Sequence, residues 1–178
     1  MYDIIYADPP WNYRDQAKAG RRGAIFKYKT MKLKDIIALP VSNISSENSI
    51  LFLWSTMPMI PNALQVLSAW GFSYKTVAFT WVKRNKKAHS WFWGMGNWTR
   101  SNSEICMLGT KGKPKRINAS VHSIVEHPIL SHSEKPPIVR DKIVQLCGDR
   151  PRIELFARSN CTGWECWGDE VENSIKLL

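Results

Sequence analysis

The most constraining feature of this chain lies within its first eleven residues. An apolar run, Ile-Ile-Tyr-Ala at 4–7, leads directly into Asp8-Pro9-Pro10-Trp11. A short apolar run of this kind predicts a buried strand, and the strands of open α/β sheets present their functional groups at their carboxyl ends. We therefore expect Asp8 at the carboxyl end of a buried strand.

Two consecutive prolines make the chain after Asp8 stiff. Pro9 has no N–H, its ring fixes φ, and Pro10 favours an extended conformation for it. The Pro9 carbonyl should therefore point in a fixed direction beside the Asp8 carboxylate, with the Trp11 ring next to both. Two rigid acceptors beside an aromatic plane suit a planar ligand that carries an NH2 group, such as a nucleobase. A surface turn in which Trp11 covers the core is the alternative that this segment alone leaves open.

Strands alternate with helices along the rest of the chain. We expect strands at 50–54, 76–82, 104–109 and 152–158, helices at 33–39, 61–70 and 137–147, and a short last helix with Asp169 as its N-cap. The stretches 12–29 and 117–136 show neither helical nor strand periodicity. This alternation predicts an α/β fold with a mostly parallel sheet, and 178 residues fit one domain over 1–178.

Charge and tryptophan content indicate a polyanionic partner. The net charge is +10, and the chain contains nine tryptophans. Basic residues alternate with large aromatics over 81–100, which favours a binding surface for nucleic acid or protein. Tryptophans folded back onto the core are the alternative. The basic segment 12–29 is either a phosphate-facing lid or a solvated loop, and 110–116 either grips phosphates or forms a turn.

The remaining composition narrows the class of protein. The four cysteines and four histidines lack zinc-ligand spacing, so we expect no metal site and reduced thiols. We find neither a run of apolar residues long enough to span a bilayer nor a signal-peptide pattern. We therefore expect a cytoplasmic protein, in a bacterial host cell if the resemblance described next holds, without a membrane partner.

The ordered motifs of the chain resemble the Asp-Pro-Pro-Trp family of adenine methyltransferases. This family includes the eukaryotic mRNA adenosine methyltransferases and small phage or bacterial DNA adenine methyltransferases, which the chain resembles most in its length and in the segment 91–100. The motifs that carry the resemblance are Asp8 to Trp11, Tyr28 to Met31, Leu51 to Trp54, Trp81 to Lys83, Glu104 to Gly112, His132 to Pro136 and Glu154 to Arg158.

The resemblance implies both a fold and a reaction. The fold would be the Rossmann-like S-adenosylmethionine-dependent methyltransferase fold, with helices on both faces of the sheet and a permuted order that places the catalytic motif first. The reaction would transfer a methyl group from S-adenosylmethionine to the N6 amine of adenine in DNA. Acceptance of both amine protons, by Asp8 and the Pro9 carbonyl, would direct the nitrogen lone pair at the methyl group.

The resemblance also assigns residues to the site. It makes Asp8, Pro9, Pro10 and Trp11 catalytic. The expected substrate contacts are Tyr28, Trp54, Lys83 and Arg100. The expected cofactor contacts are Asp8, Lys135, Phe156, Arg158, Asn160, Asp169 and Glu170, with Lys135 pairing with the methionine carboxylate of the cofactor.

The chain departs from the family pattern near its end, where the usual Gly-Asn-Gln or Gly-Asn-Glu reads Gly168-Asp169-Glu170. It also begins at the first strand, without an upstream segment that supplies cofactor contacts in larger relatives. An RNA adenosine N6-methyltransferase and a non-catalytic nucleic-acid-binding scaffold subunit are the alternatives to a DNA enzyme. Monomer and homodimer are both compatible with the sequence.

Overall fold

The computed structural model describes residues 1–12, 30–96, 98–131 and 134–177. Seven strands in this part of the chain form one sheet, in the order β5-β3-β4-β2-β1-β6-β7. The strands are β1 (Tyr2–Ala7), β2 (Ser45–Ser55), β3 (Ser73–Arg84), β4 (Glu104–Lys111), β5 (Ile124–Pro128), β6 (Arg152–Leu155) and β7 (Glu165–Trp167). The helices are α1 (Leu33–Ile37), α2 (Val41–Ile44), the 3₁₀ turn η2 (Met57–Met59), α3 (Ile60–Ala69) and α4 (Ile138–Cys147).

The sheet is mixed but mostly parallel, which confirms the expected class. The strand β1 pairs in parallel with β2 and with β6, and the pairs β6–β7 and β3–β5 are also parallel. Only β4 runs against its neighbours, β2 and β3. The strands β1, β2, β3, β6 and β7 consequently share one direction, so their carboxyl ends meet at one edge of the sheet.

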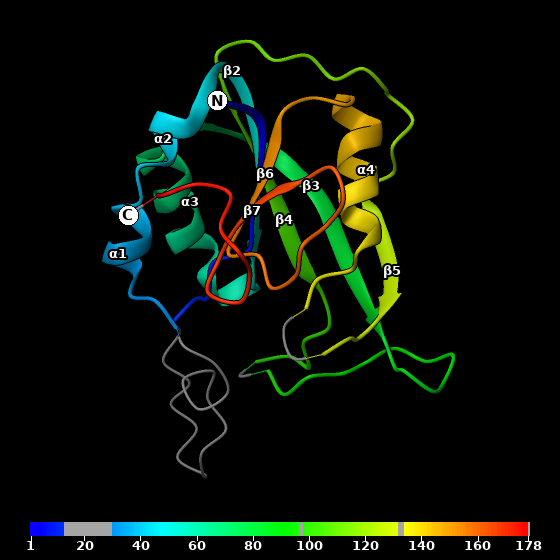
Figure 1. The fold of residues 1–178 in the computed structure, drawn as a ribbon. Helices are drawn as coiled ribbons and strands as arrows, with labels where there is room; N and C mark the ends of the chain where they lie inside the picture. Colours follow the sequence, from blue (N-terminus) through cyan, green and yellow to red (C-terminus); the bar gives the residue numbers. More distant parts are fainter. Residues whose placement is uncertain (13–29, 97, 132–133, 178) are drawn as a thin grey trace.

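Alternating side chains of β1 and β2 build a core on each face of this sheet. Ile5 and Ala7 face the core under α1 and α3, whereas Ile4 and Tyr6 face the core under α4. The strand β2 alternates in the same way. Figure 1 shows α1 and α3 on one side of the sheet and α4 on the other. The helices therefore cover both faces, as expected, and β1 is buried between β2 and β6.

The expected helix after Asp169 is wrong. The segment after β7 forms no helix in the described residues, and two of its side chains instead bond backbone groups of β7 and Gly168. Asn173 Oδ1 accepts from the Gly168 N–H at 2.7 Å, and Ser174 Oγ accepts from the Cys166 N–H at 3.0 Å. These bonds turn the chain back onto β7.

Other boundaries differ for local reasons. The expected strand 152–158 ends at Leu155, because Phe156 adopts a positive φ of 61°. The strands β5 and β7 are short edge strands that the sequence did not indicate, and β5 leaves alternate residues exposed. In the part of the chain that the structure describes, no helix is both long and apolar enough to cross a bilayer.

Candidate active site

A cavity of about 670 Å³ opens where the carboxyl ends of the parallel strands meet. Segments that follow β1, β2, β6 and β7 supply most of its wall. The start of β4, the segment before α4, residues 30–32 and Asp35 of α1 supply the rest. Its lining includes Asp8, Pro9, Pro10, Trp11, Glu104, Lys135, Phe156, Arg158, Gly168, Asp169 and Glu170. Most of the residues expected to be catalytic or to bind cofactor therefore lie around one cavity.

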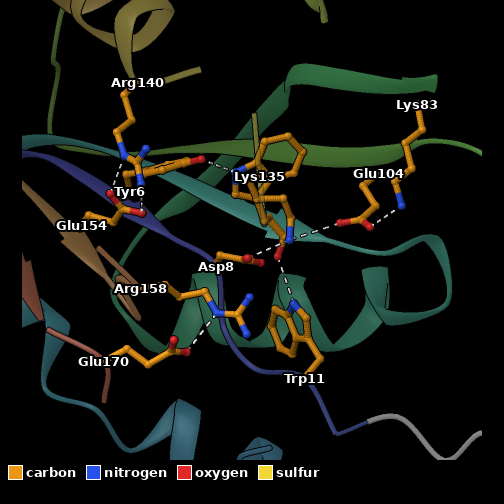
Figure 2. Close-up of polar contacts among 11 residues, drawn as sticks. Tyr6, Asp8, Trp11, Lys83, Glu104, Lys135, Arg140, Glu154, Arg158 and Glu170 are labelled. Atoms are coloured by element: carbon orange, nitrogen blue, oxygen red, sulfur yellow. Dashed lines mark hydrogen bonds and ion pairs between the residues drawn. The ribbon is translucent and has the colours of Figure 1, made fainter. Parts of the chain in front are cut away.

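Charged side chains of alternating sign cross the wall of this cavity (Figure 2). Lys135 Nζ lies 2.7 Å from Asp8 Oδ2 and 3.3 Å from Glu104 Oε2. The other oxygen of Glu104, Oε1, lies 2.6 Å from Lys83 Nζ. The Lys135 side chain is only 7% exposed, so these charges interact with little solvent screening.

Burial and charge set the protonation states of this row. Burial raises the pKa of Asp8 above its ordinary value, and Lys135 offsets part of that rise. Burial would also raise the pKa of Glu104, but the ammonium groups of Lys135 and Lys83 outweigh it and hold that pKa below the ordinary value. Although burial opposes its charge, the Lys135 pKa is raised by the two carboxylates. Lys135 therefore stays protonated between them.

The two prolines hold a tight turn after Asp8. The Trp11 N–H donates to the Pro9 carbonyl at 2.8 Å, and the Met31 N–H donates to the Pro10 carbonyl at 2.9 Å. A carbonyl oxygen has two lone pairs, so Pro9 keeps one acceptor site. Asp8 Oδ1 accepts no hydrogen bond from any described residue. Two acceptor sites thus remain beside each other at the cavity.

Trp11 combines the two interpretations that the sequence left open. It is 4% exposed and belongs to the core, yet it also lines the cavity. Its Nε1 donates to the Trp54 carbonyl at 3.1 Å, which fixes the ring. An indole held in this way presents a rigid apolar wall.

The opposite wall comes from the segments after β6 and β7. Phe156, in its left-handed backbone conformation, packs edge-on against Trp167 with 5.5 Å between ring centroids. Arg158 Nε lies 3.1 Å from Glu170 Oε1. Asn160 is exposed and does not line the cavity, so the structure does not bring it together with the other expected cofactor contacts.

The structure places Trp54 in the core. This side chain is 0% exposed, and its Nε1 donates to the Tyr6 hydroxyl at 2.7 Å in the core under α4. It touches the site through the ring face that Lys135 Nζ approaches at 5.6 Å from the centroid. The buried ring does not line the cavity and lies against Lys135, so a direct contact of Trp54 with substrate stays a prediction.

Two of the remaining expected substrate contacts, Lys83 and Arg100, do not line the cavity. Lys83 pairs with Glu104 behind its wall. Arg100 is exposed, and its guanidinium donates to the Gly94 and Trp93 carbonyls at 2.9 and 3.3 Å. Tyr28 lies outside the described residues, as does the rest of the basic segment 13–29.

Glu104 is a site residue that sequence reasoning missed. It lies in the motif 104–112, but only as the first residue of an apolar strand. A carboxylate at the first position of a buried strand needs a cationic partner, and this requirement was the sequence signal that could have identified Glu104.

A second buried ion pair, Arg140 with Glu154, lies beside Asp8 in Figure 2. The Arg140 nitrogens Nε and Nη2 lie 2.6 and 2.8 Å from the two Glu154 oxygens. Among the described residues, no cluster of His, Cys, Asp or Glu could hold a metal ion.

The sequence of this site matches a known family. The MT-A70 family model matches residues 2–170, which includes all the described residues that line the cavity. The chain belongs to the MT-A70 family. The resemblance drawn from the Asp-Pro-Pro-Trp motif is thereby confirmed, and the chain is a member of a methyltransferase family.

Curated MT-A70 relatives fall into two groups. A type II methyltransferase, M.MunI of Mycoplasma sp, is 37% identical over 195 residues, which cover 99% of this chain and 81% of that protein. The human N(6)-adenosine-methyltransferase catalytic subunit METTL3 is 25% identical and covers 99% of this chain. The chain spans only 29% of METTL3 and 24% of an MT-A70-like N(6)-adenosine-methyltransferase of Arabidopsis thaliana, which is 24% identical.

Proposed function

We propose that this chain transfers a methyl group from S-adenosylmethionine to the N6 amine of adenine in DNA. The observation that carries the proposal is the pair of acceptors at the cavity, Asp8 Oδ1 and the Pro9 carbonyl. They lie on adjacent residues, one ionisable and one rigid, beside the fixed ring of Trp11. A primary amine on a planar base has two N–H donors, and this wall offers two acceptors and a stacking surface for it.

The cavity suits the cofactor in size and in chemistry. Small-molecule sites occupy about 300–1,000 Å³, and this cavity measures about 670 Å³. S-adenosylmethionine carries a carboxylate, an ammonium, a sulfonium and a ribose diol. In this proposal Lys135, which also bonds Asp8 and Glu104, pairs with the carboxylate. Phe156 and Arg158 contact the ribose, and Asp169 and Glu170 contact the cofactor adenine; all four residues line the cavity.

The chain's own residues would promote transfer by orientation and charge. When bound, S-adenosylmethionine supplies an electrophilic methyl group on sulfur. Asp8 Oδ1 and the Pro9 carbonyl would accept hydrogen bonds from the two N6 hydrogens, so that the nitrogen becomes pyramidal and its lone pair, no longer delocalised into the ring, points towards the methyl carbon. In the transfer, in which a C–N bond replaces the C–S bond, the Asp8 carboxylate would take up the excess N6 proton. The raised pKa of Asp8 favours this last step.

Two observations favour DNA over RNA as the substrate. The relative that matches along most of its own length, M.MunI, is a type II methyltransferase. The adenosine methyltransferases match over less than a third of theirs. We propose that residues 1–178 act as one methyltransferase domain, with DNA as the partner, in the cytoplasm of a bacterial host.

Transfer of radiolabelled methyl groups tests the proposal. Wild type and Asp8→Ala would be incubated with labelled S-adenosylmethionine and with adenine-containing single- and double-stranded DNA and RNA. We expect label in N6-methyladenine of DNA with the wild type, and none with Asp8→Ala. Label in RNA alone would show that the substrate is RNA and not DNA. Cofactor binding without transfer to any substrate would identify a non-catalytic scaffold.

A further inference from the structure

The segment between β3 and β4 holds large aromatic side chains in solvent. Trp91 is 45% exposed, Trp93 54%, Met95 85% and Trp98 99%. Exposed apolar side chains that adjoin in this way mark an interaction surface. The alternative, that tryptophans of 81–100 fold back onto the core, describes Trp81 and not these residues.

Hydrogen bonds to the backbone tie the two described parts of this segment, 85–96 and 98–103, to each other and to the end of β3. Asn102 Nδ2 donates to the Lys83 carbonyl at 2.9 Å and also to that of Phe92, and Gly94 N–H donates to the Ser101 carbonyl at 2.7 Å. Arg100 bonds the carbonyls of Gly94 and Trp93, as described above. These bonds hold the backbone while the indole rings remain exposed to solvent. The rings are therefore accessible to a binding partner.

Charge identifies the kind of partner. Between Lys83 and Glu104 the sequence has four further basic residues and no Asp or Glu; they are Arg84, Lys86, Lys87 and Arg100. Protein interfaces lose charged residues at their centre, whereas a surface for nucleic acid combines positive charge with aromatic rings on which bases stack. The composition of this segment fits a nucleic acid.

The segment begins and ends at the candidate active site. Because β3 runs in the same direction as β1, it ends at the edge where the cavity opens. In Figure 1 the chain leaves β3 at the edge of the sheet where it also leaves β1. The segment ends at Glu104, which lines the cavity and pairs with Lys135. A nucleic acid that lies on these indoles would therefore lie at the same edge of the sheet as the acceptors on Asp8 and Pro9.

We propose that Trp93 and Trp98 form a stacking platform for bases that flank the target adenine when it is turned out of a DNA duplex. This inference rests on the proposed function. An N6 amine within a duplex cannot reach the cavity until its base leaves the stack, which exposes the faces of neighbouring bases. The rings cover those faces, and Lys86 and Lys87 meet phosphates. Arg100 positions Trp93 through its carbonyl, and its exposed guanidinium adds positive charge to the surface.

Binding measurements test the platform separately from methyl transfer. Wild type, Trp98→Ala and Tyr74→Ala would be titrated against fluorescein-labelled, adenine-containing duplexes of randomised sequence, with anisotropy as the readout. Tyr74 is 46% exposed at the opposite end of β3 and serves as the matched control. We expect Trp98→Ala to weaken duplex binding about tenfold, since removal of one base–aromatic stack has an effect of this order. Tyr74→Ala should bind like wild type.

Further arms make each outcome decisive. Trp98→Phe should restore most of the affinity, and cofactor affinity should be equal in all variants. Duplex binding by Trp98→Ala within twofold of wild type overturns the platform, as does a change of oligomeric state in that variant, which would assign the rings to a protein contact. Failure of wild type to methylate any DNA would overturn the proposed function, while a loss of binding in Trp98→Ala would still support the platform.

Discussion

Lys135 Nζ and Asp8 Oδ2 lie 2.7 Å apart, although 127 residues separate them in the sequence. The ammonium leaves Asp8 Oδ1 facing the cavity and keeps the carboxylate charged in a buried place. Lys135 also bonds Glu104, so one cation orients a carboxylate from the end of β1 and another from the start of β4. This arrangement makes the acidity of Asp8 depend on two neighbours of opposite sign.

Substitution of Lys135 and substitution of Glu104 should shift the pH dependence of the methyl-transfer rate in opposite directions. Activity requires Asp8 ionised, so it falls as pH drops through the Asp8 pKa, which burial places above the ordinary value. Lys135→Met removes a positive charge that lowers the Asp8 pKa, so the fall in rate at low pH should begin at a higher pH. Glu104→Gln removes a negative charge that raises the Asp8 pKa, so the fall in rate should begin at a lower pH. Single-turnover rates with saturating cofactor measure both, and shifts in the same direction contradict the proposed coupling.

Asp8→Asn tests the acceptor role with little change in shape. The amide replaces a charged acceptor by a neutral group, so we expect the transfer rate to fall by about 10²- to 10⁴-fold, as for loss of a positioned acid–base group. Asp3→Asn, in the strand that precedes Asp8, should leave the rate within twofold. Rapid-quench kinetics at saturating cofactor and DNA measure the step. A rate above a tenth of wild type would exclude Asp8 from proton transfer.

The sequence predicts the site residues well where a functional group directly follows a predicted strand. The apolar run 4–7 can only be a buried strand, and the prolines after Asp8 leave few conformations. That reasoning places Asp8 and Pro9 at the cavity. The same reasoning does not tell where the Trp54 ring lies. A tryptophan at a strand end gives the same sequence pattern whether its ring faces a ligand or the core. Which face it takes depends on the pairing of β1 with β2, which local sequence does not encode.

Long-range pairing explains the other differences. The position of Glu104 at the start of a buried strand indicates that it needs a cationic partner, but nothing in the sequence between them identifies Lys135 as that partner. The edge strand β7 has three residues, too few for a period to show. The end of β6 depends on the positive φ of Phe156, a conformation that is rare for residues other than glycine.

The buried pair of Arg140 and Glu154 should contribute to stability. Arg140 Nε and Nη2 each bond one oxygen of Glu154, whose side chain is 9% exposed. Arg140→Met leaves that carboxylate buried without its partner, so we expect the free energy of unfolding to fall by about 3 kcal/mol. Arg116→Met, at an exposed arginine, is the control. Urea denaturation measures both, and the double variant Arg140→Met/Glu154→Leu should recover part of the loss.

The Tyr6 hydroxyl provides a test of the core position of Trp54. Tyr6→Phe removes the acceptor of the buried indole N–H, so the free energy of unfolding should fall by about 1–3 kcal/mol. Tyr74→Phe, at an exposed tyrosine, should change it little. If Trp54 is a core residue, the KM for DNA should stay at the wild-type value in Tyr6→Phe. A changed KM for DNA with an unchanged free energy of unfolding would indicate that Trp54 contacts the substrate.

Gly168 keeps two segments of the cavity wall together. A Cβ at this position would lie 2.2 Å from the Ala157 carbonyl oxygen and 2.8 Å from the Ala157 nitrogen, both backbone atoms. Because Ala157 also donates to the Trp167 carbonyl at 3.0 Å, the backbone has no room to yield locally. Gly168→Ala should therefore separate the segments that carry Arg158 and Glu170.

We expect this separation to weaken cofactor binding about 10- to 100-fold, the scale on which displacements near 1 Å act in a site. Isothermal titration with S-adenosylmethionine measures it directly. Gly109→Ala is the matched control, because its Cβ would meet only Leu67 side-chain atoms, at 3.0 to 3.1 Å. That variant should lose some stability and keep its cofactor affinity. Cofactor affinity unchanged in Gly168→Ala would show that Arg158 and Glu170 do not hold the cofactor, whereas equal losses in both variants would reflect general destabilisation.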